Sequence, residues 1–181
     1  VLIGESREEA RQRAVEIDSS NADRQEKERE ILAEVQNQID NNPELLNERV
    51  LIFSGKNWHG GVIGIVAARL VGKYGKPCFV ITDDGEFAKG SARSIEGFSL
   101  YDAVSSASDL LIHYGGHVLA AGFGMKSENT EKFREAMYAY AKSVDMPFAK
   151  NIIDCKLRPA AVEADILPLI DMVLVMSVEP G

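Results

Sequence analysis

The sequence predicts an α/β fold in which a mixed β-sheet is flanked by helices and preceded by a long connector helix. Two patterns predict this class. Through residues 5–40, apolar residues recur at three- and four-residue steps, which is the spacing of one helix face. From Arg49 onward, short apolar runs alternate with helical patterns, as they do in domains that bury a sheet between helices.

The connector helix has apolar ends and a polar middle. Residues 18–30 are almost wholly polar, so this part of the helix has little to bury. Such a helix either bridges two domains or lies on the surface of one, and the pattern alone favours neither. Pro43 disfavours helix in the residue before it, so the helix is expected to end at Asn41-Asn42. The apolar positions are Ala10, Ala14, Ile17, Ile31, Leu32, Val35 and Ile39.

The first half of the α/β domain combines buried strands with one helix. Gly60-Gly61 opens the helical run, which ends between Gly72 and Gly75, and Asp83-Asp84-Gly85 is a turn signal. The expected elements are a strand over 50–53, a helix over 62–71, a strand over 77–82 and a strand over 87–94.

The second half continues the alternation. Ser99 and Asp102 resemble a capping box, with Ser99 as the N-cap of a helix that runs to about Ile112. Asn129 or Thr130 is expected to cap a later helix. The remaining expected elements are a strand over 121–126, a helix to about Val144, a strand over 152–157 and a helix over 162–176. We therefore divide the chain into a connector (1–48), an α/β domain (49–148) and the start of a further domain (149–181).

Composition restricts the classes of protein to consider. No window approaches the ~18 uninterrupted apolar residues of a membrane span, so we expect no membrane partner. Cys78 and Cys155 lack CxxC spacing, which favours a reducing, cytoplasmic location. The chain starts at Val1 and stops within an apolar pattern, which indicates a piece of a longer protein.

Charge is unevenly distributed along the chain. Residues 51–127 carry six acidic and seven basic residues, whereas residues 1–50 carry 13 acidic and seven basic ones. The net charge of −8 argues against a strongly basic nucleic-acid binder. The glycine-rich middle is nevertheless the part of the chain that repels a polyanion least.

The segment Asn57-Trp58-His59-Gly60-Gly61 lies between a strand and a helix. Helix amino-terminal amides without partners can bind phosphate or carboxylate. A tight turn with Trp58 packed over it is the competing interpretation. All three side chains from Asn57 to His59 can donate hydrogen bonds, which is unusual for a plain turn.

The strand over 87–94 places Lys89, Ser91 and Arg93 on one face and smaller residues on the other. A face of lysine, serine and arginine suits an anion, because a guanidinium can hold two phosphate oxygens in a forked contact. An ordinary solvated strand is the alternative. The small residues indicate close packing on the opposite face, so the polar face is expected to be the open one.

The stretch HYGGHVLAAGFGM over 113–125 contains four glycines. Gly115 after a helix is explained by a left-handed C-terminal cap, but a cap explains one glycine rather than four. The alternative is that Gly116 and His117 line a ligand-facing wall, with the AAGFG strand supporting it. His113 and His117 are four residues apart, but the glycine pair between them disfavours a regular helix and no HExxH motif is present, so we expect no metal site within this chain.

Taken in order, four motifs resemble a known family. WHGGVIGIVAARL, KPCFVIT, GSARS and YGGHVLAAGFGM are similar to the DHH-associated domain of RecJ single-stranded-DNA-specific exonucleases, a branch of the DHH phosphoesterase superfamily. The resemblance covers residues 50–145 closely. The helix with Asn21 and Arg24 resembles the family's connector, and the segment from Ile153 resembles the run into its oligonucleotide-binding fold.

The resemblance implies a function for the parent protein. It implies 5′→3′ degradation of single-stranded DNA by a metal-dependent phosphodiesterase, with Mn²⁺ or Mg²⁺ held by a separate DHH domain. This chain has no Asp-His-His triplet, so it is expected to lack catalytic residues and to be inactive alone. Ser91 and Arg93 match the element that grips the 5′ phosphate. Gly115, Gly116 and His117 match the Gly-Gly-His element that lies against substrate, with His117 as an assisting donor.

We count Lys89, Asn57 and His59 with these phosphate-binding candidates, although the resemblance leaves the roles of Asn57, His59 and His113 open. The expected partners are single-stranded DNA and the DHH domain. Two alternatives remain: a nanoRNA or dinucleotide phosphoesterase of the same superfamily, and a non-catalytic RNA-binding module like that of alanyl-tRNA synthetase.

Overall fold

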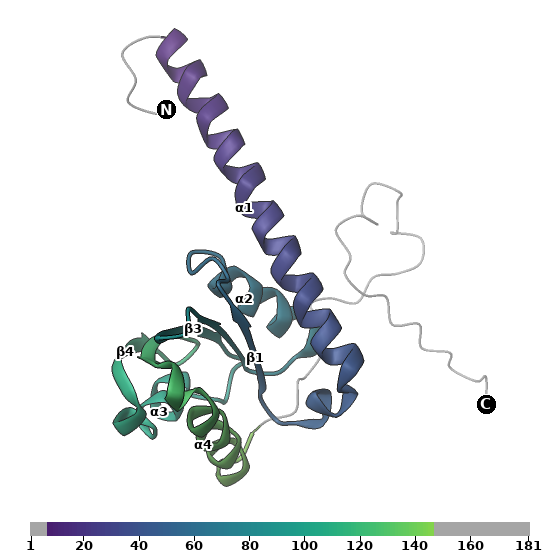
Figure 1. Cartoon of the computed structure of the whole chain (residues 1–181), viewed down its shortest axis with the longest axis vertical. Coiled ribbons are helices and arrows are strands. Elements are labelled where there is room, and N and C mark those ends of the chain that lie inside the picture. Colours follow the sequence, from purple (N-terminus) through teal and green to yellow (C-terminus); the bar gives the residue numbers. More distant parts are fainter. Residues whose placement is uncertain (1–6, 147–181) are drawn as a thin grey trace, which may run out of the picture. The chain divides into compact units, whose positions relative to one another are not determined.

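The computed structural model describes residues 7–146, and the expected elements over 152–176 lie outside this range. The chain begins with the predicted long helix, α1 (Arg7–Asn41), followed by a 3₁₀ turn η1 (Pro43–Asn47) that starts at Pro43. Figure 1 shows α1 passing beside α2 (Ile63–Tyr74) with its carboxyl-terminal half. The predicted long helix and its end near Asn41 are thus confirmed.

A five-stranded mixed sheet follows, confirming the predicted α/β class. The parallel pair β1–β2 is joined through α2, and the other neighbouring strands are antiparallel. The strand order is β1-β2-β3-β5-β4, which leaves β4 as an edge strand. The strands are β1 (Leu51–Lys56), β2 (Cys78–Asp83), β3 (Phe87–Arg93), β4 (Leu111–His117) and β5 (Ala120–Lys126).

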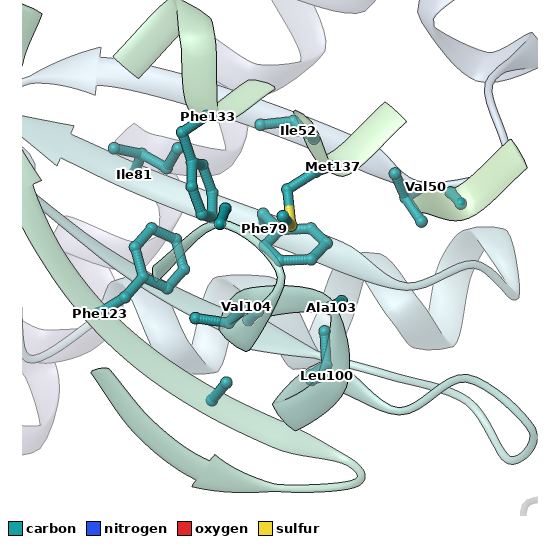
Figure 2. Close-up of a cluster of buried hydrophobic side chains, with 14 of the residues drawn as sticks. Val50, Ile52, Phe79, Ile81, Leu100, Ala103, Val104, Phe123, Phe133 and Met137 are labelled. Atoms are coloured by element: carbon teal, nitrogen blue, oxygen red, sulfur yellow. The ribbon is translucent and has the colours of Figure 1, made fainter. Parts of the chain in front are cut away.

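Hydrophobic cores lie on both faces of the sheet. On one face, α3 (Leu100–Ser105) and α4 (Thr130–Ser143) pack over the sheet around Phe79, Phe123 and Phe133, as Figure 2 shows. On the other face, α1 and α2 cover β1 and β2. Gly90 belongs to the first core, where an added Cβ would overlap the Phe123 ring.

The carboxyl-terminal half of α1 packs against the α/β domain through apolar contacts and ion pairs. Ile31, Val35 and Ile39 are buried in the second core. Just before them, the buried Glu28 carboxylate forms ion pairs with Arg24 and with Arg69 of α2. The polar stretch before Glu28 is almost entirely exposed, as the sequence pattern predicted for the middle of this helix.

One predicted element is wrong. The sequence pattern predicted a helix from Ser99 to about Ile112, capped by Gly115, but α3 ends at Ser105 and residues 111–117 form β4. A 3₁₀ turn η2 (Ser108–Leu110) separates the two elements. The apolar residues through Leu110 pack against the first core from this turn, so their helical spacing does not require a continuous helix.

The two predicted caps have different outcomes. The Ser99 hydroxyl accepts from the Asp102 amide at 3.3 Å, which confirms it as the N-cap of α3. Asn129 occupies the N-cap position of α4, but its side chain makes no capping bond. It donates instead to the Leu110 carbonyl oxygen at 3.0 Å and so ties α4 to the turn before β4.

Candidate functional site

Helices α1 and α2 cover one sheet face over β1 and β2, and α2 also reaches Ser91 and Arg93 of β3. The part of this face over β3, β5 and β4 is less covered, and we call it the open face. The alternating burial of β3 places Ala88, Gly90 and Ala92 in the first core, so the intervening residues point the other way. Strand pairing then fixes which residues share a row across the three strands, because paired residues point to the same side. The three rows are Lys89–Gly124–His113, Ser91–Gly122–Gly115 and Arg93–Ala120–His117.

The middle row provides bare backbone, and we call Gly115 and Gly122 the glycine floor. An added Cβ at Gly115 would meet nothing within 4 Å, and one at Gly122 would meet only the Gly90 carbonyl oxygen at 3.9 Å. Both residues are exposed. These glycines are therefore not required for packing within the chain, and their missing side chains leave room for a ligand to approach the backbone.

Ser91 and Arg93 form a hydrogen-bonded pair beside this floor. The Arg93 guanidinium donates to the Ser91 hydroxyl at 3.1 Å and to the Ala92 carbonyl oxygen at 2.8 Å. Among residues 7–146, no carboxylate forms an ion pair with Arg93. The guanidinium is thus held in place by neutral acceptors and keeps its charge available for an anion.

The first turn of α2 reaches the same pair. A Cβ at Gly64 would lie 3.0 Å from both an Arg93 terminal nitrogen and the Ser91 hydroxyl, so only glycine gives full clearance here. α2 has no side-chain cap and no acidic residue in its first turn. The positive end of its dipole therefore lies near a free guanidinium, and both favour negative charge at this corner.

The loop before α2 combines a structural tryptophan with exposed neighbours. Trp58 is buried, its indole donates to Glu34 at 2.8 Å, and its carbonyl oxygen accepts from the Thr82 hydroxyl at 2.8 Å. Its ring fills the space where Gly55 lacks a side chain. Asn57 takes a positive φ of 57°, and its backbone N–H donates to the Asp83 carbonyl oxygen at 3.0 Å. Trp58 therefore packs as in the turn interpretation, while His59, Gly60 and Gly61 remain exposed.

The histidines of β4 border the glycine floor from its far side. The His117 Nδ1 accepts from the Leu119 amide at 3.3 Å, so the neutral ring carries its proton on Nε2, where it can donate. The His113 ring lies over Gly124, because an added Cβ at Gly124 would overlap it. His113 and His117 are both exposed and flank Gly115 on the open face.

Gly116 has a different role from Gly115. It adopts φ of 149°, and an added Cβ would overlap the Ala120 carbonyl oxygen across the hairpin. Beyond it, the Val118 and Leu119 carbonyl oxygens accept from the Leu100 and Ser94 amides at 2.9 and 3.0 Å. The predicted helix cap at Gly115 is therefore wrong, since both glycines lie in a strand. Gly116 serves the backbone of the hairpin, while Gly115 lies on the open face.

The sequence-based candidates separate into three groups. Lys89, Ser91, Arg93, Gly115 and His117 share the open face, whereas Gly116 serves the hairpin and Asn57 and His59 lie on the loop before α2. The pattern missed Gly64, Gly122 and His113. The signals were a glycine inside a helical run, a glycine on the exposed side of AAGFG, and a histidine two residues before Gly115.

The donors on the open face do not suit a divalent cation. Mn²⁺ and Mg²⁺ prefer oxygen ligands, especially carboxylates, and the three rows contain no carboxylate side chain. No group of three or more acidic, histidine or cysteine side chains within residues 7–146 is arranged to hold a metal ion. Within the same residues, no helix is long and apolar enough to cross a bilayer.

Comparison with known proteins gives a consistent family. The DHHA1 domain model matches residues 46–143. The chain is 33% identical over 181 residues to the single-stranded-DNA-specific exonuclease RecJ of Bacillus subtilis, and 34% identical over 141 residues to that of Thermus thermophilus. These matches cover 99% and 78% of this chain but only 21% and 20% of the relatives.

Solved structures agree with the sequence comparisons. The manganese complex of Thermus thermophilus RecJ superposes with a TM-score of 0.75 at 32% identity, over 92% of this chain and 24% of that one. A second manganese-bound exonuclease RecJ superposes with a TM-score of 0.63 at 34% identity, over 72% of this chain and 31% of that one. The chain thus spans about a fifth to a third of each of these RecJ proteins.

Proposed function

The chain belongs to the DHHA1 domain family and is homologous to RecJ exonucleases, and from this premise we propose that it is the substrate-binding part of a RecJ-like 5′→3′ single-strand exonuclease. In this proposal, the open face grips the phosphate backbone and the 5′ end of single-stranded DNA. The parent enzyme is cytoplasmic, acts in DNA repair and recombination, and carries its catalytic centre on a separate DHH domain.

The Arg93–Ser91 pair beside the glycine floor carries the proposal. A guanidinium held by neutral acceptors can offer its remaining N–H groups to two phosphate oxygens. The uncapped start of α2 adds favourable dipole charge at the same corner. The floor lets a sugar–phosphate chain approach the sheet without meeting a side chain. These three features together favour a terminal phosphate at Arg93 and the rest of the strand across the floor.

His117 and Lys89 complete the proposed surface at its two ends. His117 presents an Nε2 proton from the row that contains Arg93. Lys89 supplies positive charge in the row at the opposite end of the open face. We assign Gly115 a direct place on this surface and Gly116 an indirect one through the hairpin. The Asn57–Gly61 loop lies before α2 and is proposed to border the 5′-phosphate corner.

The proposal places no bond cleavage on this chain. RecJ structures have been solved with Mg²⁺ and with Mn²⁺. In the parent enzyme we propose that such a metal supplies the activated water from the DHH domain, opposite the open face. The residues described here bind and orient the strand.

Binding measurements with Arg93→Ala test the proposal. We expect the 181-residue chain to bind a 5′-phosphorylated thymidylate octamer weakly, with Kd on the order of 10⁻⁴ M or above at low salt. Arg93→Ala should weaken binding and lower the salt dependence by about one phosphate contact. Arg29→Ala is the matched control, because Arg29 is an exposed arginine of α1 paired with Glu26.

The same substitutions in the complete enzyme test the assignment to exonuclease activity. Unchanged affinity and unchanged cleavage in Arg93→Ala would overturn the proposal. Degradation of dinucleotides in preference to long single strands would support a nanoRNA phosphoesterase instead. Selective binding of transfer RNA by this chain would support a stand-alone RNA-binding module.

A further inference from the structure

A fourth row extends the open face beyond Lys89. Phe87 pairs with Lys126, and both follow the strand alternation that places Lys89 and Gly124 on this face. Phe87 is 41% exposed although it is a large apolar residue at the end of a regular strand. It faces away from the core that receives its neighbour Ala88. The fold therefore leaves a large part of its aromatic surface uncovered.

Two lysines and a histidine lie beside this exposed ring on the open face. Lys126 lies opposite Phe87, and Lys89 and His113 occupy the adjacent row. The Lys126 ammonium lies 3.9 Å from Glu128, a loose contact between two largely exposed side chains. The nearby Asp84 carboxylate is already hydrogen-bonded to the Phe87 and Glu86 amides, at 2.7 and 3.0 Å. Lys126 therefore has only this loose contact, and Lys89 forms no ion pair within residues 7–146, although its charge helps to hold the pKa of Asp84 below the ordinary value.

An exposed aromatic ring with one lysine in its own row and another in the next row suits a nucleotide of a single strand. Bases stack on aromatic rings regardless of their identity, while lysines follow the phosphates. We propose that Phe87, Lys89, His113 and Lys126 form a second nucleotide subsite, in which a base stacks on Phe87 and a phosphate contacts the two lysines and the His113 imidazole. This inference rests on the proposed function, because it needs a strand that begins at Arg93.

The spacing between the two subsites specifies the substrate class. Arg93 and Phe87 are six residues apart on β3, which corresponds to about 20 Å along the strand. A dinucleotide whose 5′ phosphate lies at Arg93 does not span this distance, but an oligonucleotide does. The second subsite therefore favours oligonucleotides over dinucleotides.

Binding of thymidylates of two lengths tests this subsite. We expect Phe87→Ala to weaken binding of a 5′-phosphorylated thymidylate octamer to the 181-residue chain by about tenfold. Binding of the phosphorylated dimer should change by less than about twofold. Phe87→Tyr keeps a stacking ring and should retain most of the octamer affinity. Tyr101→Ala removes an equally exposed ring from α3, which packs against the other sheet face, and should leave both affinities unchanged.

The outcomes separate this inference from the proposed function. If Arg93→Ala weakens octamer binding but Phe87→Ala does not, the second subsite is overturned and the proposed function stands. Equal losses in Phe87→Ala and Phe87→Tyr, or in Phe87→Ala and Tyr101→Ala, also overturn the stacking role. If the unaltered chain binds neither oligonucleotide at low salt, or if neither Arg93→Ala nor Phe87→Ala has an effect, both proposals fall.

Discussion

The Arg93 guanidinium donates to the hydroxyl of Ser91, two residues before it on the same strand, across 3.1 Å. A second bond to the Ala92 carbonyl oxygen fixes the planar group further. The guanidinium is therefore oriented before any ligand arrives, and less side-chain entropy is lost when it binds a phosphate.

Arg93→Lys separates the contribution of charge from that of orientation. Lysine keeps the positive charge but loses the planar fork, so we expect weaker binding of 5′-phosphorylated single strands with an unchanged slope of log K against log salt. Titrations at several salt concentrations provide both quantities. A slope reduced as far as in Arg93→Ala would show that the lysine no longer reaches the phosphate. Full affinity in Arg93→Lys would show that the fork is not used.

Alanine at the glycine floor should reduce binding without reducing stability. Gly115→Ala and Gly122→Ala place a methyl group in open space, and alanine also restricts the unfolded chain. We expect the free energy of unfolding to stay within about 0.5 kcal/mol or to rise slightly, and oligonucleotide affinity to fall. Urea denaturation and binding titrations of the same samples measure the two effects.

Gly116→Ala is the structural counterpart of these two variants. Its positive φ and the overlap with the Ala120 carbonyl oxygen predict a loss of about 1–3 kcal/mol in the free energy of unfolding. If Gly116→Ala were as stable as Gly115→Ala, the division of the two glycines between hairpin and surface would be wrong. Unchanged affinity in both floor variants would remove the case for close backbone approach.

Arg69→Ala should loosen the junction between α1 and α2. Glu28 is 2% exposed, and Arg69 is one of its two ionic partners. Removing Arg69 leaves a buried carboxylate with fewer partners, and we expect a loss of about 1–2 kcal/mol in stability. Denaturation of Arg69→Ala, Glu28→Gln and the double variant measures the coupling. Additive losses in the double variant would show that this ion pair contributes nothing.

Asp84 should make a small, pH-dependent contribution to stability. Hydrogen bonds from the Phe87 and Glu86 amides hold the pKa of Asp84 below its ordinary value. The folded chain therefore favours the ionised form, and this stabilisation is complete above the unfolded pKa of about 4 and disappears as the pH falls through the folded pKa. Denaturation midpoints of Asp84→Asn should lie below those of the unaltered chain at pH 7 and converge with them in acid. Parallel curves at every pH would contradict this role.

The sequence was sufficient to predict the elements in which apolar residues recur at a regular helix or strand spacing, or in which a local cap is present. The long helix, the β3 alternation and the Ser99 cap each depend on local residues, and each is confirmed. The open face itself depends on more than local pattern. Residues Lys89, Ser91 and Arg93 were predicted to share a face, but the row that joins Ser91 to Gly122 and Gly115 follows from the strand order.

The edge strand β4 was missed for a physical reason. Its residues beyond Leu111 are all exposed, so it shows no alternation of buried and polar side chains. The preceding apolar residues through Leu110 happen to repeat at helical steps, and the pattern extended the helix through them. Once β4 is paired with β5, Gly115 and Gly116 lie on opposite faces of the sheet. A helix cap at Gly115 would not predict this difference between the two glycines.

The strict alternation along β3 has a consequence for how this protein can change. The core side of the strand and the ligand side are interleaved residue by residue, Ala88, Gly90 and Ala92 against Lys89, Ser91 and Arg93. Deleting one residue between Phe87 and Lys89 would turn Lys89 and Arg93 toward the core side of the sheet. Substitutions on the ligand side can therefore alter binding without repacking the core, whereas a single insertion or deletion in the strand would disturb both sides.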